Sequence, residues 1–238
     1  MIYFYIALGI ILAPFVFVLT AWILGMLYLQ TRYLINKDIP YTSKRIQTAI
    51  KIFSLLLIKS FRLKYKVINK HLIPKTDAVM FGNHISALDP VVLVYELNHT
   101  HVSGLAKKAI FNFPVFKHYI TARRVIPMDR TNNRKDAEAM IQAIKQAKEG
   151  QLMFVFPEGT RSRDGNLLEF RAGAFRLATK SKKDIYVFKF KHMNEHKYYH
   201  LWRKTCTLEF FPVIKYEDYK DLSTMELSNM VRKIITEG

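Results

Sequence analysis

The pattern of apolar and polar positions divides the chain into an apolar first segment and a body in which strands and helices alternate. Residues 1–30 contain no Asp, Glu, Lys, Arg or His. As a helix rising about 1.5 Å per residue, this stretch is long enough to cross the roughly 30 Å hydrocarbon layer of a bilayer. Pro14 interrupts it, so one kinked span and two half-length helices that enter and leave the same leaflet both stay open. We expect residues 1–61 to form a membrane-anchoring helical segment.

A second helix is predicted within the last part of that segment. Between Ser43 and Phe61, apolar residues recur at helical spacing opposite lysine and arginine side chains. Such a basic amphipathic helix either packs on the domain core or lies in the membrane interface. The basic residues that follow the apolar stretch predict that the body lies on the cytoplasmic side of a cell membrane.

The remaining residues, 62–238, predict a single α/β domain. Short runs rich in β-branched and aromatic residues predict strands at residues 63–68, 77–81, 124–128, 152–156, 184–190 and 206–214. Helical patterns occupy residues 90–97, 136–150 and 173–182, and a capping box at Ser223 begins a last helix. Strands that alternate with helices predict a largely parallel central sheet flanked by helices.

Composition narrows the partners without selecting one. The chain has 37 Lys and Arg against 19 Asp and Glu, a formal net charge of +18 that lies entirely after residue 30. Such a body attracts anionic lipid, phosphate groups, acidic proteins or nucleic acid. The single cysteine, Cys206, excludes an internal disulfide, has no CxxC partner for zinc and fits a reducing compartment. Its apolar surroundings predict that it packs in a strand.

A histidine and an aspartate lie five residues apart in NHISALDP, between a predicted strand and a predicted helix. Asp89 and Pro90 are favoured residues for a helix start, so His84 falls in the turn that precedes the helix and the two side chains can meet. A carboxylate that accepts the imidazole Nδ1–H leaves Nε2 as a base able to activate a hydroxyl toward an acyl carbonyl. We predict that His84 and Asp89 are a catalytic pair, although HxxxxD alone is a weak motif.

The segment FPEGTRS, residues 156–162, follows another predicted strand. In a parallel α/β sheet, ligands bind at the carboxyl ends of the strands. Gly159 permits a tight turn, and Thr160 offers a hydroxyl. Arg161 offers a planar fork that suits phosphate oxygens, with Glu158 nearby to hold it. A surface turn with a solvated ion pair is the alternative.

Arg130 in VIPMDRTN also follows a predicted strand, and Asp129 beside it is placed to orient it. Singly this is a weak signal, because most arginines face solvent. The combination is stronger, because the base pair, this arginine and the EGTR turn all fall at predicted strand ends.

Together these motifs resemble those of the lysophospholipid acyltransferases, especially the 1-acyl-glycerol-3-phosphate acyltransferases, over about residues 60–215. The resemblance implies transfer of an acyl group to the 2-hydroxyl of lysophosphatidate, which gives phosphatidic acid in phospholipid biosynthesis. In this interpretation His84 is the general base and Asp89 orients it. A thioester of acyl-carrier protein or coenzyme A is the co-substrate and leaves as the thiol, with no metal or other cofactor.

The resemblance also implies a substrate-binding set, and FRAGAFRLA at residues 170–178 extends the match. The residues implied to bind the glycerol phosphate are Lys107, Arg130, Glu158, Gly159, Thr160 and Arg161. The expected partners are then the bilayer, lysophosphatidate and the acyl donor. Two positions depart from the family pattern: Arg124 stands where a glycine is usual, and Val187 stands where a proline is usual.

Three alternatives remain. Within the family, the acceptor is glycerol 3-phosphate or another lysophospholipid. His192 to His196 fits an HxxEH zinc pattern, but it follows a strand and lacks an apolar helical face, so we expect no metal there. A membrane-tethered basic protein without enzyme activity, binding anionic lipid or nucleic acid, is favoured only by interleaved basic and aromatic residues at 189–204. These match no nucleic-acid module, so no nucleic acid partner is expected.

Overall fold

The computed structural model describes residues 43–129, 131–162, 164–192 and 205–238, together with isolated positions between residues 3 and 25. Most of the apolar first segment, and with it the predicted membrane helix or helices, lies outside the described residues. Within the described part of the chain, no helix combines the length and the apolar character needed to cross a membrane.

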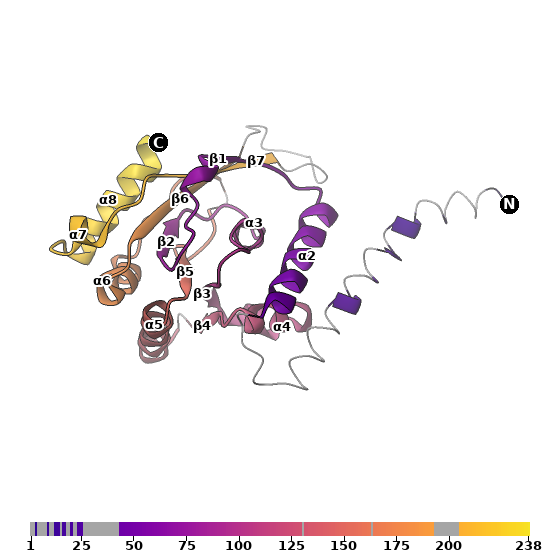
Figure 1. Cartoon of the computed structure of the whole chain (residues 1–238), viewed down its shortest axis with the longest axis horizontal. Helices are drawn as coiled ribbons and strands as arrows, with labels where there is room; N and C mark the ends of the chain where they lie inside the picture. Colours follow the sequence, from indigo (N-terminus) through magenta and orange to yellow (C-terminus); the bar gives the residue numbers. More distant parts are fainter. Residues whose placement is uncertain are drawn as a thin grey trace.

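The described strands form one central sheet (Figure 1). Their bounds are β1 Lys64–Ile68, β2 Val79–Gly82, β3 Val102–Lys107, β4 Ile126–Met128, β5 Leu152–Val155, β6 Ile185–His192 and β7 Thr205–Phe210. The order across the sheet is β1-β7-β6-β2-β5-β3-β4. All neighbours are parallel except β6 and β7, which are antiparallel. The predicted α/β fold with a largely parallel sheet is therefore confirmed.

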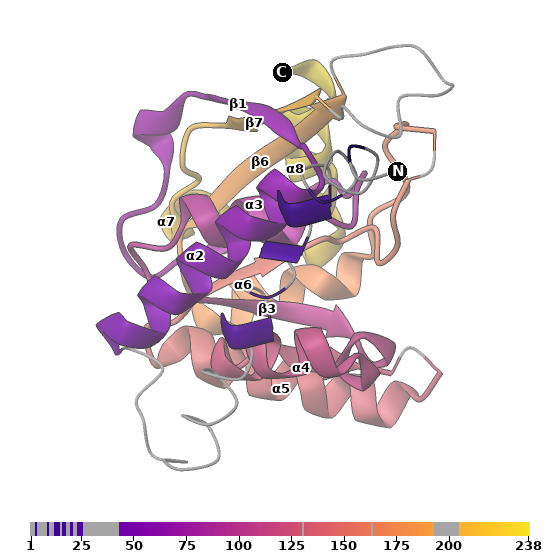
Figure 2. The ribbon, with the colours of Figure 1, turned by 90° about the vertical axis from the view of Figure 1, so that its right-hand side faces the viewer.

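Helices cover both faces of this sheet (Figure 1). One face carries α2 Lys44–Ser60, α3 Asp89–Glu96 and α4 Pro114–Ala122, and the other carries α5 Asn133–Lys148, α6 Arg176–Ser181, α7 Tyr216–Tyr219 and α8 Thr224–Glu237. Short 3-10 helices are η1 Lys70–Leu72, η2 Lys108–Asn112 and η3 Ala172–Phe175. Figure 2 shows α2 lying across α3, with which it is in contact.

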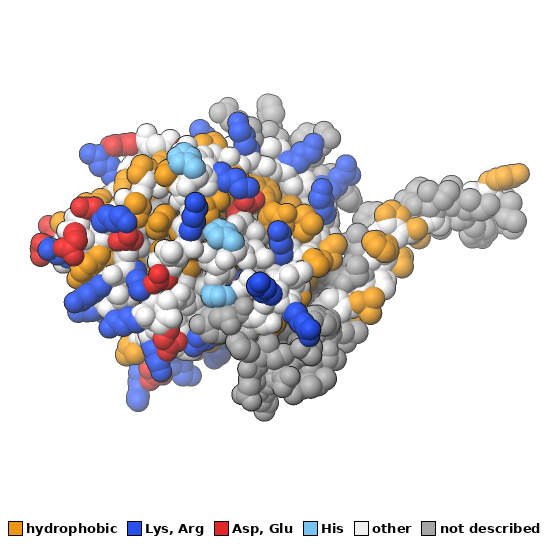
Figure 3. Space-filling model, in the orientation of Figure 1, with side chains coloured by type: hydrophobic (Ala, Val, Ile, Leu, Met, Phe, Trp, Pro, Cys, Tyr) orange, Lys and Arg blue, Asp and Glu red, His pale blue; other side chains and the backbone are white. Residues whose placement is uncertain are grey.

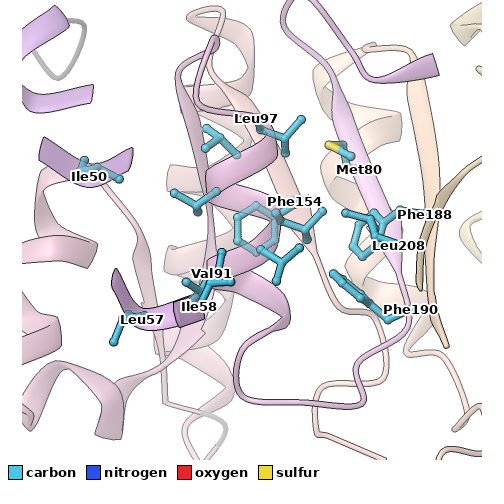
Figure 4. Close-up of a cluster of buried hydrophobic side chains, with 14 of the residues drawn as sticks. Ile50, Leu57, Ile58, Met80, Val91, Leu97, Phe154, Phe188, Phe190 and Leu208 are labelled. Atoms are coloured by element: carbon cyan, nitrogen blue, oxygen red, sulfur yellow. The ribbon is translucent and has the colours of Figure 1, made fainter. Parts of the chain in front are cut away.

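Two hydrophobic clusters, one on each face, hold the layers together. On the first face, Leu57 and Ile58 of α2 and Val91 of α3 point toward Phe154 and Phe188 of the sheet (Figure 4). On the second face, the helices α5, α6 and α8 pack against the alternate side chains of the same strands. This alternation follows from the period of two in a β-strand, which sends successive side chains to opposite faces.

The helix predicted at residues 43–61 forms and contributes to the packed body. Its buried side chains include Ile50, Phe53 and Leu57, so the core-packing alternative holds for this face of the helix. Ile52 and Leu55 on its other side stay exposed, at 54% and 37% of their surface. Figure 3 shows that Lys and Arg side chains outnumber Asp and Glu on the visible face of the molecule, in line with the net charge.

The sequence prediction lacks one strand, β3, and the helix α4, together with the short helices η1, η2 and α7. The strand β3 reads VSGLAK, in which Gly104 breaks the expected β pattern, yet a side chain there would collide with the Phe154 carbonyl of the neighbouring strand. The predicted strand 206–214 is too long, because β7 ends at Phe210. Beyond it, the Phe211 N–H donates to the Val187 carbonyl, and an isolated bridge joins Ile214 to Ile185.

Helix ends agree with the sequence signals. Gly150, φ +90°, follows the end of α5, and the capping box of Ser223 and Glu226 begins α8. The predicted helix 173–182 begins instead as the 3-10 helix η3 and becomes α-helical at Arg176.

Candidate active site

The carboxyl ends of β2, β5, β3 and β4 lie side by side along one edge of the sheet, because these strands are parallel neighbours. His84 follows β2, Glu158 follows β5, and Lys107 ends β3. Arg130 follows β4 but lies outside the described residues. Segments far apart in the sequence therefore converge on the edge where parallel α/β sheets bind ligands.

His84 and Asp89 meet through the turn between β2 and α3. The imidazole Nδ1 lies 2.9 Å from Asp89 Oδ2. The same oxygen accepts the backbone N–H groups of Ile85 and Ser86, each at 2.8 Å. Asp89 was expected as the N-cap of the helix, whereas Leu88 is the N-cap and Asp89 is the first helical residue. Its carboxylate faces back into the turn, where it fixes the imidazole.

The EGTR segment holds His84 from the other side. The imidazole stacks on Phe156, with ring centroids 4.1 Å apart and an interplanar angle of 17°. The His84 N–H donates to Glu158 Oε1 at 2.9 Å, and the His84 carbonyl accepts the Ser162 N–H at 2.8 Å. The two motifs, 74 residues apart in the sequence at this contact, form one unit.

Glu158 is 4% exposed, and both of its oxygens serve the loops of the site. Oε1 accepts from His84, and Oε2 accepts the Leu168 N–H at 3.4 Å. Burial raises the pKa of the Glu158 carboxyl above its ordinary value, and these two backbone donors oppose that shift. These contacts show that Glu158 positions the turn that carries His84, while a contact with the substrate stays a prediction.

Gly159 brings a second arginine to the site. Its φ of +70° favours glycine, and the Nε of Arg171 lies 2.9 Å from the position that a Cβ would occupy. The backbone of Arg171 is tied to the loop by its N–H, which donates to the Pro157 carbonyl at 2.9 Å. Thr160 and Arg161 follow as exposed residues. Sequence reasoning did not single out Arg171, although it lies in the FRAG segment of the recognised block.

The β3 and β4 ends supply further cations. Lys107 is exposed at the end of β3. Lys108 next to it pairs with Asp129 at 3.2 Å. Hydrogen bonds from Thr131 and Lys108 lower the pKa of the Asp129 carboxyl. The Asp129 N–H also donates to Asp136 Oδ1 at 2.9 Å. Asp129 was expected to orient Arg130, and this stays a prediction because Arg130 lies outside the described residues.

Asn83 is a second residue that the sequence argument left without a role. Its buried side chain accepts the Phe190 N–H at 2.7 Å and donates to the Phe190 carbonyl at 2.8 Å. These paired bonds join the turn before His84 to β6. Cys206 is buried nearby, and burial together with Asp89 raises the pKa of its thiol to about 12, which fits its predicted packing role.

The two departures from the family pattern have different structural settings. Arg124 has φ +55°, a left-handed conformation that glycine adopts without strain, which accounts for the glycine usual at this place. Val187 is fully buried within β6, which runs without interruption through it. The HxxEH segment beyond His192 lies outside the described residues.

Comparison with known proteins identifies the family. The family described as Acyltransferase matches residues 64–190, more than half of the 238 residues. The chain belongs to this family. Among curated proteins, this chain is 34% identical to the 1-acyl-sn-glycerol-3-phosphate acyltransferase of Borreliella burgdorferi over 111 residues. The match covers 47% of this chain and 44% of that protein. The enzyme of the same name from Haemophilus influenzae is 34% identical over 115 residues, 46% of this chain and 48% of that protein. The matched stretches span about half the length of these relatives.

A solved structure shares the fold of the acyltransferase. The crystal structure of the 1-acyl-sn-glycerophosphate acyltransferase PlsC from Thermotoga maritima superposes with a TM-score of 0.69. The match covers 92% of this chain and 93% of that chain at 19% sequence identity. The likeness therefore extends to nearly the whole architecture.

Proposed function

We propose that this acyltransferase moves a fatty acyl group from an acyl thioester to the 2-hydroxyl of 1-acyl-glycerol-3-phosphate, forming phosphatidic acid in phospholipid biosynthesis. The observation that carries the proposal is the His84–Asp89 pair held against the EGTR turn at the carboxyl edge of the sheet. The names of the curated relatives support the choice of acceptor.

The chemistry follows from the orientation of the imidazole. Asp89 accepts the Nδ1–H, so Nε2 is left to take the proton of the acceptor hydroxyl as its oxygen attacks the thioester carbonyl. Collapse of the tetrahedral intermediate breaks the carbon–sulfur bond, and the imidazolium returns the proton to the leaving thiolate. No covalent acyl-enzyme and no metal or other cofactor take part in this route.

The exposed cations along the same edge suit the phosphate of the acceptor. Lys107 and Arg161 are exposed at neighbouring strand ends, and we assign the phosphate to them together with Arg130. Gly159 and Thr160 lie in the turn that carries Arg161. A guanidinium fork binds phosphate oxygens in pairs, so it also sets the orientation of the bound lipid.

The acceptor is a lipid, so the proposal includes a bilayer. The apolar residues 1–30 and the exposed Ile52 and Leu55 of α2 support attachment to a cell membrane. The basic residues after the apolar stretch support a cytoplasmic location for the catalytic body. Both donors, acyl-carrier protein and coenzyme A thioesters, are compatible with that compartment.

Acyl transfer by the purified full-length protein in detergent tests the proposal. A panel of acceptors would contain lysophosphatidate, glycerol 3-phosphate and other lysophospholipids, each with both donors. We expect phosphatidic acid as the main product and a loss of about 10²–10⁴-fold in kcat for His84→Ala. His71→Ala, at an exposed histidine in η1, is the matched control and should retain full activity.

Three results would count against the proposal. Wild-type turnover by a normally folded His84→Ala protein would remove the assigned base. Stable acylation of the protein itself would contradict direct transfer. Faster reaction of glycerol 3-phosphate or another lysolipid would correct the acceptor and leave the acyl-transfer chemistry in place.

A further inference from the structure

Four lysines share one face of the outer part of the sheet. They are Lys64 and Lys66 of β1 and Lys189 and Lys191 of β6, and we call this surface the lysine face. The strand β7 lies between β1 and β6 and places Thr205, Thr207 and Glu209 on the same face. Lys64 lies opposite Thr205, and both Lys66 and Lys191 lie opposite Thr207. Residues paired across strands point to the same side, so the four ammonium groups form one array.

The lysine face is the side of the sheet opposite α2. Phe188 and Phe190 alternate with the β6 lysines and belong to the cluster that packs against α2 and α3. On the lysine side, α8 packs against β6 through the cluster that contains Ile185 and Val187, at the beginning of the strand. Farther along, Lys191 is exposed, as are both lysines of β1, and Lys189 is half-buried.

The charge of this face is left largely unbalanced. Glu209, which lies opposite Lys189, is the single acidic residue in the sequences of the three strands, against four lysines. Among the described residues, none of the four lysines forms an ion pair within 4.0 Å. Like charges two residues apart on one strand, and across the single strand β7, repel one another, so an array of this kind lowers the stability of the free domain. An anionic partner relieves that repulsion.

The lysine face adjoins the catalytic edge. Asn83 binds both backbone groups of Phe190, and it immediately precedes His84. Lys191 follows Phe190 directly in β6. One lysine of the array is therefore next to the residue that holds the turn of His84. A partner seated on it lies at the rim of the site.

The lysine face differs from a membrane-binding surface in its lack of exposed apolar side chains. Ile52 and Leu55 are exposed residues of α2. The helix α2 lies on the opposite side of the sheet (Figure 1). No exposed large hydrophobic side chain of the described residues belongs to β1, β6 or β7. A surface that inserts into a bilayer combines apolar and basic side chains, whereas the lysine face offers charge and hydroxyl groups alone. These features favour a soluble, acidic protein.

We propose that the lysine face docks an acidic acyl-carrier protein that delivers the acyl thioester to His84 around the sheet edge. This inference rests on the proposed function, because it names the donor of that same reaction. Charge complementarity both steers and orients such a partner, so the face governs use of this donor and leaves coenzyme A thioesters unaffected.

Steady-state kinetics of the full-length protein with both donors tests the proposal. In the test variant Lys64, Lys66, Lys189 and Lys191 are changed to Gln. The control variant has the same change at four exposed lysines on other surfaces, Lys75, Lys145, Lys148 and Lys180. We expect the test variant to raise the KM for acyl-carrier protein roughly tenfold, because each exposed ion pair contributes modestly. Its KM for the coenzyme A donor, its kcat and all constants of the control variant should stay unchanged.

The other outcomes each overturn the docking proposal in a distinct way. Equal loss with both donors means that the lysines act on the fold or the site, and an unchanged KM means that they bind no carrier. Weaker sedimentation of the test variant with vesicles of anionic phospholipid would make the bilayer the occupant. If the unmodified protein is active with coenzyme A thioesters and inactive with acyl-carrier protein, the docking proposal is wrong but the proposed function stands. If it is inactive with both donors, the proposed function is wrong as well.

Discussion

At the scale of single residues, His84 is fixed through its ring and its backbone together. Asp89 binds Nδ1, Phe156 stacks on the ring, and Glu158 and Ser162 bind the N–H and carbonyl of the same residue. If His84 is the base, as we propose, it loses little freedom when the substrate binds, because its orientation is already set.

Glu158 provides a test that separates positioning from substrate binding. If Glu158 positions the turn, Glu158→Ala lowers kcat by about 10–10² while the KM for lysophosphatidate stays within a factor of about two, because the acceptor is bound by other groups. Glu158→Gln retains one oxygen acceptor for the His84 N–H and should recover part of the rate. A rise in KM with unchanged kcat would assign Glu158 to the substrate instead.

Arg124 shows how one residue can depart from a family pattern without disturbing the site. It lies at the turn between α4 and β4 with φ +55°, and it pairs with Glu149 at 3.4 Å. Its carbonyl accepts the side-chain hydroxyl of Ser103 and the amide of Gln146. A left-handed non-glycine residue costs about 1–2 kcal/mol, and the contacts of its neighbours hold the turn in place despite this cost.

At the scale of elements, the site depends on the close approach of β2 and β6. Gly82 ends β2, and a Cβ there would collide with the ring and the carbonyl oxygen of Phe188 on β6. The next residue, Asn83, makes the two bonds to Phe190. The spacing of these two strands is therefore set just before His84.

Gly82→Ala should impair both stability and catalysis. We expect the free energy of unfolding to fall by about 1–3 kcal/mol, because the added methyl group must displace packed atoms. We also expect kcat to fall by at least about tenfold, since a shift of the turn misplaces His84. Denaturant unfolding and acyl-transfer kinetics measure the two effects. Gly173→Ala, where a Cβ meets nothing within 4 Å, is the matched control, and equal behaviour of the two variants would refute this account.

At the scale of the whole molecule, an uncharged first segment is followed by a basic body. The first 30 residues carry no charge, and the body carries the formal excess of +18. Within the body, Ile52 and Leu55 of α2 are exposed on one side of the sheet. The lysine face lies on the other side, where the exposed apolar residues Ile141 and Met225 belong to α5 and α8 rather than to the strands. We therefore assign the α2 side to the bilayer and the lysine face to the acidic partner, in line with the two proposals.

Ionic strength should separate these two attachments. Raising the salt concentration from about 0.1 M to about 1 M shortens the Debye length from about 10 Å to about 3 Å. We expect kcat/KM with acyl-carrier protein to fall roughly tenfold or more, because steering by the basic body is screened. Co-sedimentation with vesicles should persist, since burial of apolar surface is not screened. Release from vesicles at high salt with an unchanged rate would reverse both assignments.

Local patterns in the sequence predicted most elements because their causes are local. The alternation of strands and helices, the glycine after α5 and the capping box of α8 depend on neighbours a few residues away. The meeting of His84 and Asp89 is local in the same sense, because a five-residue turn joins them. The strand β3 was missed because its glycine serves a contact with Phe154, which is distant in the chain.

The sequence by itself therefore determined the α/β class, the chemical groups of the site and the turn that pairs the histidine with its aspartate. Only the tertiary structure decided which strands are neighbours, because hydrogen bonding between strands joins segments that sequence patterns do not connect. That order put the turn of residues 158–161 beside His84 and gave Glu158 and Asn83 their positioning contacts. It also gathered the lysines of β1 and β6, more than a hundred residues apart in the chain, on one face.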